Sequence, residues 1–179
     1  MKIPKDLPQF KDYPTLFLVS GEFEAKFYVA KNGEISENDS FALNPREEAK
    51  EKQAFVGKKG GMQSFSAVSH HGRYIEDLKE RFAKKLRDMT EDVSNKESIR
   101  EIHVFAPGYV ESRISKKISK GSMAMVKSTH DGQYLRENPL QLLEMMKKEL
   151  EQARSTKHIH ISKDEKKIMH RPNTKPKKG

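Results

Sequence analysis

The residues best suited to chemistry lie in one short glycine-rich segment, Lys58-Lys59-Gly60-Gly61-Met62-Gln63-Ser64. Adjacent glycines allow a backbone to approach a ligand closely, because they carry no Cβ atoms. The amide of Gln63 can both donate and accept hydrogen bonds, so it can orient a water molecule. Lys58 and Lys59 can hold a phosphate group. The segment therefore predicts either a site for a phosphate-bearing ligand or a flexible basic loop.

Other reactive groups are sparse or badly spaced. The chain has no Cys, which excludes a disulfide framework, a thiol nucleophile and cysteine-bound zinc. His70 and His71 are adjacent, so their side chains point apart, and no third ligand is spaced nearby; we therefore expect no metal site. The chain also lacks the Gly-x-Ser-x-Gly elbow, so the sequence does not predict a serine hydrolase.

The charge of the chain favours a polyanion as partner. Its 179 residues include 35 Lys and Arg against 26 Asp and Glu, a net charge of +9, and RNA is the obvious candidate. Residues 155–179 alone hold eight Lys and Arg against two acidic residues. We expect residues 154–179 to form a basic, partly disordered tail. In this tail Lys175, Lys177 and Lys178 either contact RNA or only increase solubility.

The elements that would position these residues begin after an extended, proline-containing lead-in, residues 1–14. The hydrophobic patterns predict three strands, Thr15–Ser20, Phe23–Ala30 and Glu34–Leu43. Gly21-Glu22 and Asn32-Gly33 are turn signals between these strands, so we expect an antiparallel meander. The polar stretch that follows, residues 45–72, has a length and a glycine content typical of a mobile, functional loop.

The second half of the chain alternates helices and strands. Apolar residues recur at helical spacing around Phe82 and Leu86, which we expect in the core. The remaining predicted elements are a strand at Arg100–Ala106, a helix from Val110 to Gly121, a strand at Ser122–Ser128 and a helix that opens at Asn138-Pro139. This order predicts a single α/β domain over residues 15–153, with a mixed β-sheet, flanking helices and parallel later strands.

Two sets of residues resemble known families. Residues 57–86, with Gly60, Gly61 and Gln63-Ser64 before a long helix, resemble the middle domain of archaeal and eukaryotic class-one release factors and of Pelota. Residues 15–153 resemble bacterial relatives of that domain, which are catalogued as host attachment proteins. The matching residues are Phe82-Ala83-Lys84-Lys85-Leu86, Val104-Phe105-Ala106-Pro107 and Glu137-Asn138-Pro139-Leu140.

The resemblance implies a ribonuclease H-like, release factor middle-domain-like fold. It implies that Gln63 positions the hydrolytic water at the peptidyl-tRNA ester. It also implies RNA contacts from the residues around Gln63, namely Lys58, Lys59, Gly60, Gly61, Ser64 and Arg73. Met62 separates the glycines from Gln63, so the strict Gly-Gly-Gln triplet is absent, and catalytic geometry tolerates little displacement. Gln63 is therefore a candidate catalytic residue.

A ribonuclease H-like fold also raises the question of a two-metal nuclease, which needs converging carboxylates. The acidic residues on the predicted strands are scattered, and they are Glu22, Glu24, Asp39 and Glu101. We therefore do not expect nuclease chemistry. The lead-in is too short for a codon-reading domain, so we do not expect stop-codon decoding either.

We expect a translation-associated protein that binds the ribosome or tRNA and that acts in ribosome rescue by hydrolysing peptidyl-tRNA. The alternatives are a non-catalytic RNA- or ribosome-binding module, such as a silencing factor, and an indirect role in host attachment. We expect no cofactor and no membrane partner, and the oligomeric state stays open. No apolar run approaches the ~18 residues of a membrane span, and no signal peptide is recognisable, so we expect a cytoplasmic location.

Overall fold

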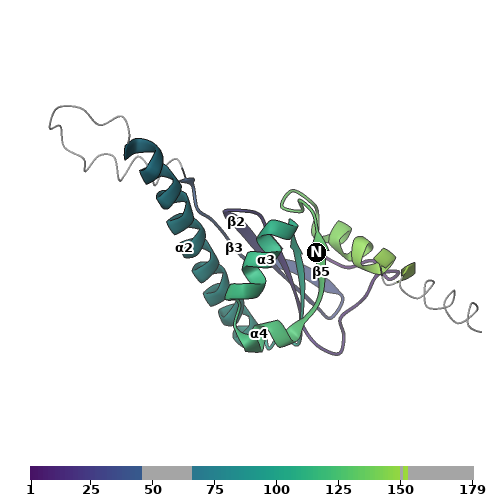
Figure 1. The fold of residues 1–179 in the computed structure, drawn as a ribbon. Helices are drawn as coiled ribbons and strands as arrows, with labels where there is room; N and C mark the ends of the chain where they lie inside the picture. Colours follow the sequence, from purple (N-terminus) through teal and green to yellow (C-terminus); the bar gives the residue numbers. More distant parts are fainter. Residues whose placement is uncertain (46–65, 150, 153–179) are drawn as a thin grey trace, which may run out of the picture.

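A run of six buried residues, Thr15–Ser20, forms the central strand β1, because a strand that is covered on both faces has no need of alternating polar residues. The computed structural model describes residues 1–45, 66–149 and 151–152. Within them, five strands form one mixed sheet in the order β3-β2-β1-β4-β5 (Figure 1).

The first three strands form the expected antiparallel meander. β1 pairs with β2, Glu24–Lys31, and β2 pairs with β3, Glu34–Ala42. Asn32 and Gly33 join β2 to β3 with φ values of 53° and 79°, the left-handed conformations that a tight hairpin turn requires. Asn tolerates this conformation and Gly adopts it freely, which explains the Asn-Gly pair at this point.

The later strands are parallel, as predicted. β4, Glu101–Ala106, pairs in parallel with β1, and β5, Val126–Asp131, pairs in parallel with β4. β2 is therefore the strand that runs against the other four. This order and polarity are those of a ribonuclease H-like sheet, and they confirm the expected α/β domain with a mixed sheet and flanking helices.

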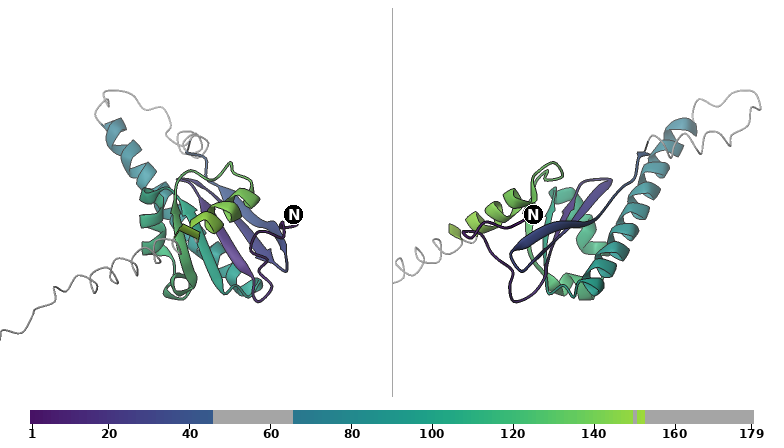
Figure 2. Two further views of the ribbon diagram at one scale, coloured as in Figure 1. Left: turned by 90° about the vertical axis from the view of Figure 1, so that its right-hand side faces the viewer. Right: turned by 180° about the vertical axis from the view of Figure 1, so that it is seen from behind.

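Helices cover both faces of the sheet (Figure 2). On one face lie α2, Ser66–Lys96, α3, Gly108–Lys117, and α4, Lys120–Met125. Phe82 and Leu86 of α2 are buried here against Leu16 and Leu18 of β1, which confirms the predicted core residues. On the opposite face Phe17 and Val19 of β1 meet the lead-in and the helix of residues 139–149.

Two boundaries differ from the sequence-based expectation. α2 begins at Ser66, so residues 66–72, expected in the glycine-rich loop, are helical. The predicted helix up to Gly121 is divided in two, because Ser119 adopts an extended conformation and its side chain accepts a hydrogen bond from the Ser122 N–H. This cap starts α4. The stretch up to Met125, expected as the start of a strand, is therefore helical, and β5 begins at Val126.

The helix of residues 139–149 opens with the expected Asn138 cap. Asn138 Oδ1 accepts from the Leu140 N–H at 3.0 Å, and Gln141 Oε1 accepts from the Asn138 N–H at 2.8 Å. The two side chains thus satisfy two backbone donors at the helix start, those of Leu140 and Asn138. None of the helices in the described ranges combines the length and hydropathy needed to cross a lipid bilayer.

Candidate functional site

The described structure places one of the predicted site residues. Arg73 is exposed near the start of α2. The other candidates lie outside the described residues, and they are Lys58, Lys59, Gly60, Gly61, Gln63, Ser64, Lys175, Lys177 and Lys178. The predicted catalytic role of Gln63 and the predicted RNA contacts in the tail therefore stay predictions.

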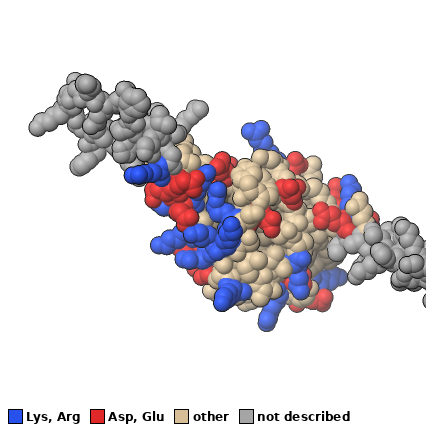
Figure 3. Space-filling model, viewed as in Figure 1, with Lys and Arg blue, Asp and Glu red and all other residues tan. Residues whose placement is uncertain are grey.

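A basic surface lies over α2 and α3, further along α2 than Arg73. We call it the α2–α3 basic surface and define it by Arg81, Lys84, Arg87 and Lys117, which line a hollow of about 360 Å³ with Glu80 as its single acidic residue. Figure 3 shows Lys and Arg side chains gathered over these two helices. The three residues on α2 are spaced three apart and so follow one another along the helix.

The ion pairs of this surface are exposed to solvent. Lys117 Nζ lies 2.6 Å from Glu80 Oε2, and Arg87 contacts the neighbouring Asp88 at 2.9 Å. In the described part of the chain Lys84 has no carboxylate partner. Exposed pairs of this kind contribute about 0–1 kcal/mol each, so an anionic ligand can displace them at little cost.

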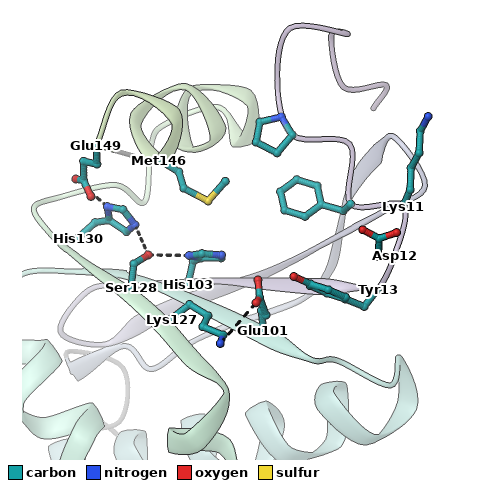
Figure 4. Close-up of a pocket in the computed structure, with 12 residues that line it drawn as sticks. Lys11, Asp12, Tyr13, Glu101, His103, Lys127, Ser128, His130, Met146 and Glu149 are labelled. Atoms are coloured by element: carbon teal, nitrogen blue, oxygen red, sulfur yellow. Dashed lines mark hydrogen bonds and ion pairs between the residues drawn. The ribbon is translucent and has the colours of Figure 1, made fainter. Parts of the chain in front are cut away.

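A separate pocket of about 540 Å³ lies on the opposite face of the sheet (Figure 4). Its walls come from the lead-in, from β4 and β5, and from the helix of residues 139–149. Pro8, Phe10 and Met146 provide apolar wall, whereas Lys11, Asp12, Tyr13, Glu101 and Lys127 provide polar groups. The other lining residues are His103, Ser128, His130 and Glu149.

These last four residues form a continuous polar chain, which we call the His–Ser–His–Glu relay. His103 Nδ1 lies 2.7 Å from Ser128 Oγ, and Ser128 Oγ lies 2.7 Å from His130 Nε2. His130 Nδ1 lies 2.9 Å from Glu149 Oε1. Figure 4 shows the relay running along one side of the pocket.

The sheet register explains the relay. His103 on β4 is paired with Ser128 on β5, and the two side chains stand on the same face. Ser128 and His130 are two residues apart on one strand, so they also share that face. The rings are fixed by stacking, since His103 lies over Phe17 at 5.3 Å and His130 lies over Phe105 at 4.2 Å between centroids.

The Glu149 carboxylate lies beside Nδ1 of His130. A carboxylate beside Nδ1 favours the His130 tautomer that carries its proton there, and Nε2 is then an acceptor for the Ser128 hydroxyl. With the Ser128 proton given to His130, Ser128 Oγ can accept from His103 in the tautomer that carries its proton on Nδ1. The His130–Glu149 contact is close but bent, because Nδ1 makes no aligned hydrogen bond.

His103 is neutral at physiological pH. Burial, and then the nearby charge of His130, lower the pKa of His103 from 6.5 to about 4, although Glu101 opposes the shift. At the pocket mouth, a hydrogen bond to Glu101 raises the pKa of Tyr13. Lys127 Nζ also approaches Glu101, at 3.8 Å. The mouth therefore carries both signs of charge.

The relay is not evident from the sequence. The Gly-x-Ser-x-Gly elbow of serine hydrolases is a sharp turn between a strand and a helix. Ser128 lies within the strand β5, so this motif does not identify it. The predicted strand Ser122–Ser128 also ends before His130, so it does not place the two residues side by side. The sequence features that could have indicated it are the alternation of Ser128 and His130 and the single histidine within the otherwise apolar run Ile102–Ala106 of β4. Within the described ranges no set of three metal-ligating side chains converges.

Comparisons with known proteins show structural neighbours but no sequence relatives. No protein family model and no curated protein matches the chain. An archaeal translation termination factor, aRF1, is 13% identical with a TM-score of 0.45, and the match covers 87% of this chain and 43% of that protein. The S. cerevisiae protein Dom34, a translation termination-like factor in RNA quality control, is 14% identical with a TM-score of 0.39, covering 84% and 41%.

A third neighbour is a Ppx/GppA family protein of Aquifex aeolicus, 12% identical with a TM-score of 0.33, covering 65% of this chain and 35% of that one. This chain thus spans less than half the length of each of these proteins. None of these three neighbours is a host attachment protein by name, so that resemblance stays a prediction. With similarities of this size, the function of the chain has to be inferred from its own side chains.

Proposed function

We propose that this protein is a translation-associated protein that binds the ribosome or tRNA through the α2–α3 basic surface. The observation that carries the proposal is the grouping of Arg81, Lys84, Arg87 and Lys117 around one hollow with a single carboxylate, Glu80. The lining side chains are four cations and one anion, and since Asp77 and Asp88 beside the hollow pair with Arg81 and Arg87, a small excess of positive charge remains. A phosphate backbone is the biological polyanion that such a surface attracts.

The proposed interaction would use phosphate contacts. The cations lie on helices, whose backbone hydrogen bonds are already made, so recognition would depend on side chains alone. The carboxylates that now contact Lys117 and Arg87 are exposed, and phosphate groups could replace them. The net charge of +9 adds a long-range attraction that would speed the encounter.

Hydrolysis of peptidyl-tRNA in ribosome rescue is the more specific form of this proposal. It rests on the resemblance of residues 57–86 to the release factor middle domain, with Gln63 as the residue that orients water and Arg73 among the RNA contacts. A non-catalytic binding module would need only the basic surface. A role in host attachment would then be an indirect consequence of altered translation.

Binding would be tested by fluorescence anisotropy with labelled tRNA and by co-sedimentation with ribosomes, over a KCl series. The test variant is the double charge reversal Lys84→Glu and Arg87→Glu. The matched control is Lys5→Glu and Lys31→Glu, which makes the same change in net charge at exposed positions in the lead-in and at the end of β2. The proposal predicts weaker binding for the test variant than for the control, with a log–log salt slope reduced by roughly 1.4–1.8.

Equal affinities of the two double variants would overturn the assignment, because the effect would then come from net charge alone. Co-sedimentation that is abolished in the test variant and kept in the control would support a localised site. The absence of tRNA and ribosome binding in the wild-type protein at low salt would contradict the proposed function altogether.

A further inference from the structure

We propose that the pocket beside the His–Ser–His–Glu relay is a hydrolytic site for small carboxylic esters, with Ser128 as nucleophile, His130 as general base and Glu149 as positioning residue. The site is separate from the α2–α3 basic surface, because the two lie on opposite faces of the sheet. The proposal therefore goes beyond RNA binding and does not depend on it.

The geometry is that of an activated serine. A serine hydroxyl becomes nucleophilic when a base lies within hydrogen-bond reach and a third group orients that base. Ser128 Oγ lies 2.7 Å from His130 Nε2, and Glu149 Oε1 lies 2.9 Å from the other ring nitrogen, Nδ1. The nucleophile, base and carboxylate thus follow one another in the order that acyl transfer requires, with a hydrogen bond between Ser128 and His130 and a close but unaligned contact between His130 and Glu149.

The relay is also more polar than packing alone would require. His103 and His130 are both buried on a sheet face whose other members are largely apolar. Buried polar groups cost free energy unless they are well paired, and His130 Nδ1 is not well aligned with any acceptor. An apolar side chain at these positions would avoid this cost. The polar groups occur where the pocket reaches the sheet, which is the place where a ligand could use them.

The pocket suits a small ester with an apolar group. A volume of about 540 Å³ lies in the usual range for small-molecule sites, about 300–1,000 Å³. Phe10 and Met146 provide an apolar wall for an acyl chain, while Ser128 lines the same cavity. Figure 4 shows the Ser128 hydroxyl between the two histidines, on the side of the pocket opposite Tyr13.

In the first step Ser128 Oγ forms a bond to the ester carbonyl carbon and its proton passes to His130 Nε2. The carbonyl π electrons move to the carbonyl oxygen. The C–O bond to the alcohol then breaks as these electrons return, and the leaving alcohol takes the proton from His130. In the second step a water molecule gives a proton to His130 and attacks the acyl-serine, so that the acid leaves and Ser128 regains its proton. The net reaction is ester plus water to acid plus alcohol.

Each other member of the relay has a defined part in these steps. The Glu149 carboxylate stabilises the His130 imidazolium that forms transiently, and it keeps Nε2 in the accepting tautomer beforehand. His103 remains neutral, and in the tautomer that carries its proton on Nδ1 it donates to Ser128 Oγ, so that it holds the nucleophile in place and does not compete for its proton.

The test uses the full-length protein with two probes, a fluorophosphonate that labels activated serines and p-nitrophenyl butyrate as a small apolar ester. Intact mass spectrometry and peptide mapping should find one adduct per chain on Ser128. Ser128→Ala should abolish labelling and reduce ester hydrolysis to the rate without protein. The matched control is Thr129→Ala, one residue along β5, whose side chain lies on the other face and lines a different hollow. It should label and hydrolyse like the wild type.

Two further variants separate catalysis from structure. His130→Asn should lower kcat by at least about 100-fold, the usual contribution of a general base. Glu149→Gln should lower kcat about tenfold or more with little change in KM, and Glu149→Asp should restore part of the rate. Because Glu149 is exposed, its variants should keep the wild-type Tm.

The proposal is overturned if the folded wild-type protein forms no adduct, if labelling falls mainly on other serines, or if Ser128→Ala hydrolyses the ester at the wild-type rate. The affinity for tRNA should be measured on the same Ser128→Ala protein, and it should equal that of the wild type. This measurement separates a failure of the ester site from a failure of the proposed RNA binding. An adduct on Ser128 with no RNA binding would support the ester site alone.

Discussion

The ring of Phe82 lies 5.1 Å from the ring of Phe41, centroid to centroid, and this contact joins the middle of α2 to β3 at one edge of the sheet. Phe23 meets the same Phe82 ring edge-on at 6.4 Å. A single buried side chain on α2 thus holds together two parts of the meander and the long helix.

Replacing Phe82 with Ala should destabilise the protein by about 3–5 kcal/mol, because the change removes a fully buried ring and leaves a cavity between α2 and the sheet. Chemical denaturation gives the free energy of unfolding. Lys84→Ala, on the exposed side of the same helix, is the control and should lie within about 0.5 kcal/mol of wild type. A Tm of Phe82→Ala equal to that of wild type would contradict the assigned helix face.

Replacing Asn138 with Ala should cost about 0.5–2 kcal/mol, since the Leu140 N–H loses its acceptor at the helix start. Asn138→Asp should retain most of the stability, because a carboxylate oxygen can accept the same hydrogen bond. Denaturation curves of the three proteins provide the comparison. An alanine variant as stable as wild type would show that the cap makes no net contribution.

Stability should fall on acidification between pH 6.5 and about 4 because of His103. The unfolded His103 binds a proton below pH 6.5, while the folded residue resists protonation until its lowered pKa of about 4. Protons therefore favour the unfolded state in this range, and the decrease in stability amounts to at most about 3 kcal/mol. His103→Gln keeps an N–H donor but does not titrate. Unfolding free energies at neutral and at mildly acidic pH should differ less for this variant than for wild type.

Replacing Gln63 with Ala should lower peptide release while leaving RNA binding almost intact, if the protein hydrolyses peptidyl-tRNA. The reason is that the amide would orient water without contributing to affinity. Deleting Met62 restores the Gly-Gly-Gln triplet and should raise any release activity. Single-turnover release of a labelled peptide from stalled ribosomes measures both effects. If the wild-type protein releases peptide no faster than the control without protein, the catalytic proposal is wrong and the non-catalytic binding module is the remaining interpretation.

Deleting residues 155–179 should weaken RNA binding and reduce its salt dependence. The segment carries eight Lys and Arg against two acidic residues, and the log–log slope falls by roughly 0.7–0.9 for each phosphate that the protein no longer neutralises. Anisotropy titrations of tRNA over a KCl series give the slope. If the salt dependence of binding is unchanged by the deletion, the tail does not contact RNA, and its alternative role is to increase solubility.

Local patterns made most of the fold predictable. The buried run of β1, the Asn32-Gly33 turn and the apolar stripe around Phe82 are each determined by residues close in sequence, and the structure confirms all three. The predicted start of β5 was wrong because the six-residue helix α4 has too few residues to show a periodicity. The capping residue Ser119 was the sequence feature that could have predicted the start of α4.

The polar relay could not be predicted in the same way, since it depends on contacts between distant segments. His103 meets Ser128 because β5 lies beside β4 in a particular register, and a shift by one residue would turn Ser128 to the other face. Glu149 joins them from a helix that follows β5. Each residue alone resembles an ordinary polar position, and only the assembled sheet brings them together.

The length of α2 has a consequence for the size of any RNA ligand. Its 31 residues span about 46 Å, and in Figures 1 and 2 the start of the helix extends well past the sheet. Arg73 and Arg87 are fourteen residues apart on this helix, hence about 21 Å along its axis. With a rise of about 3.4 Å per nucleotide along a stacked strand, this span corresponds to about six intervals, so a stacked strand needs about seven nucleotides to contact both arginines. If RNA binds along α2 as proposed, a stacked trinucleotide could contact only one of the two arginines, and the length of the helix would then set a minimum ligand length.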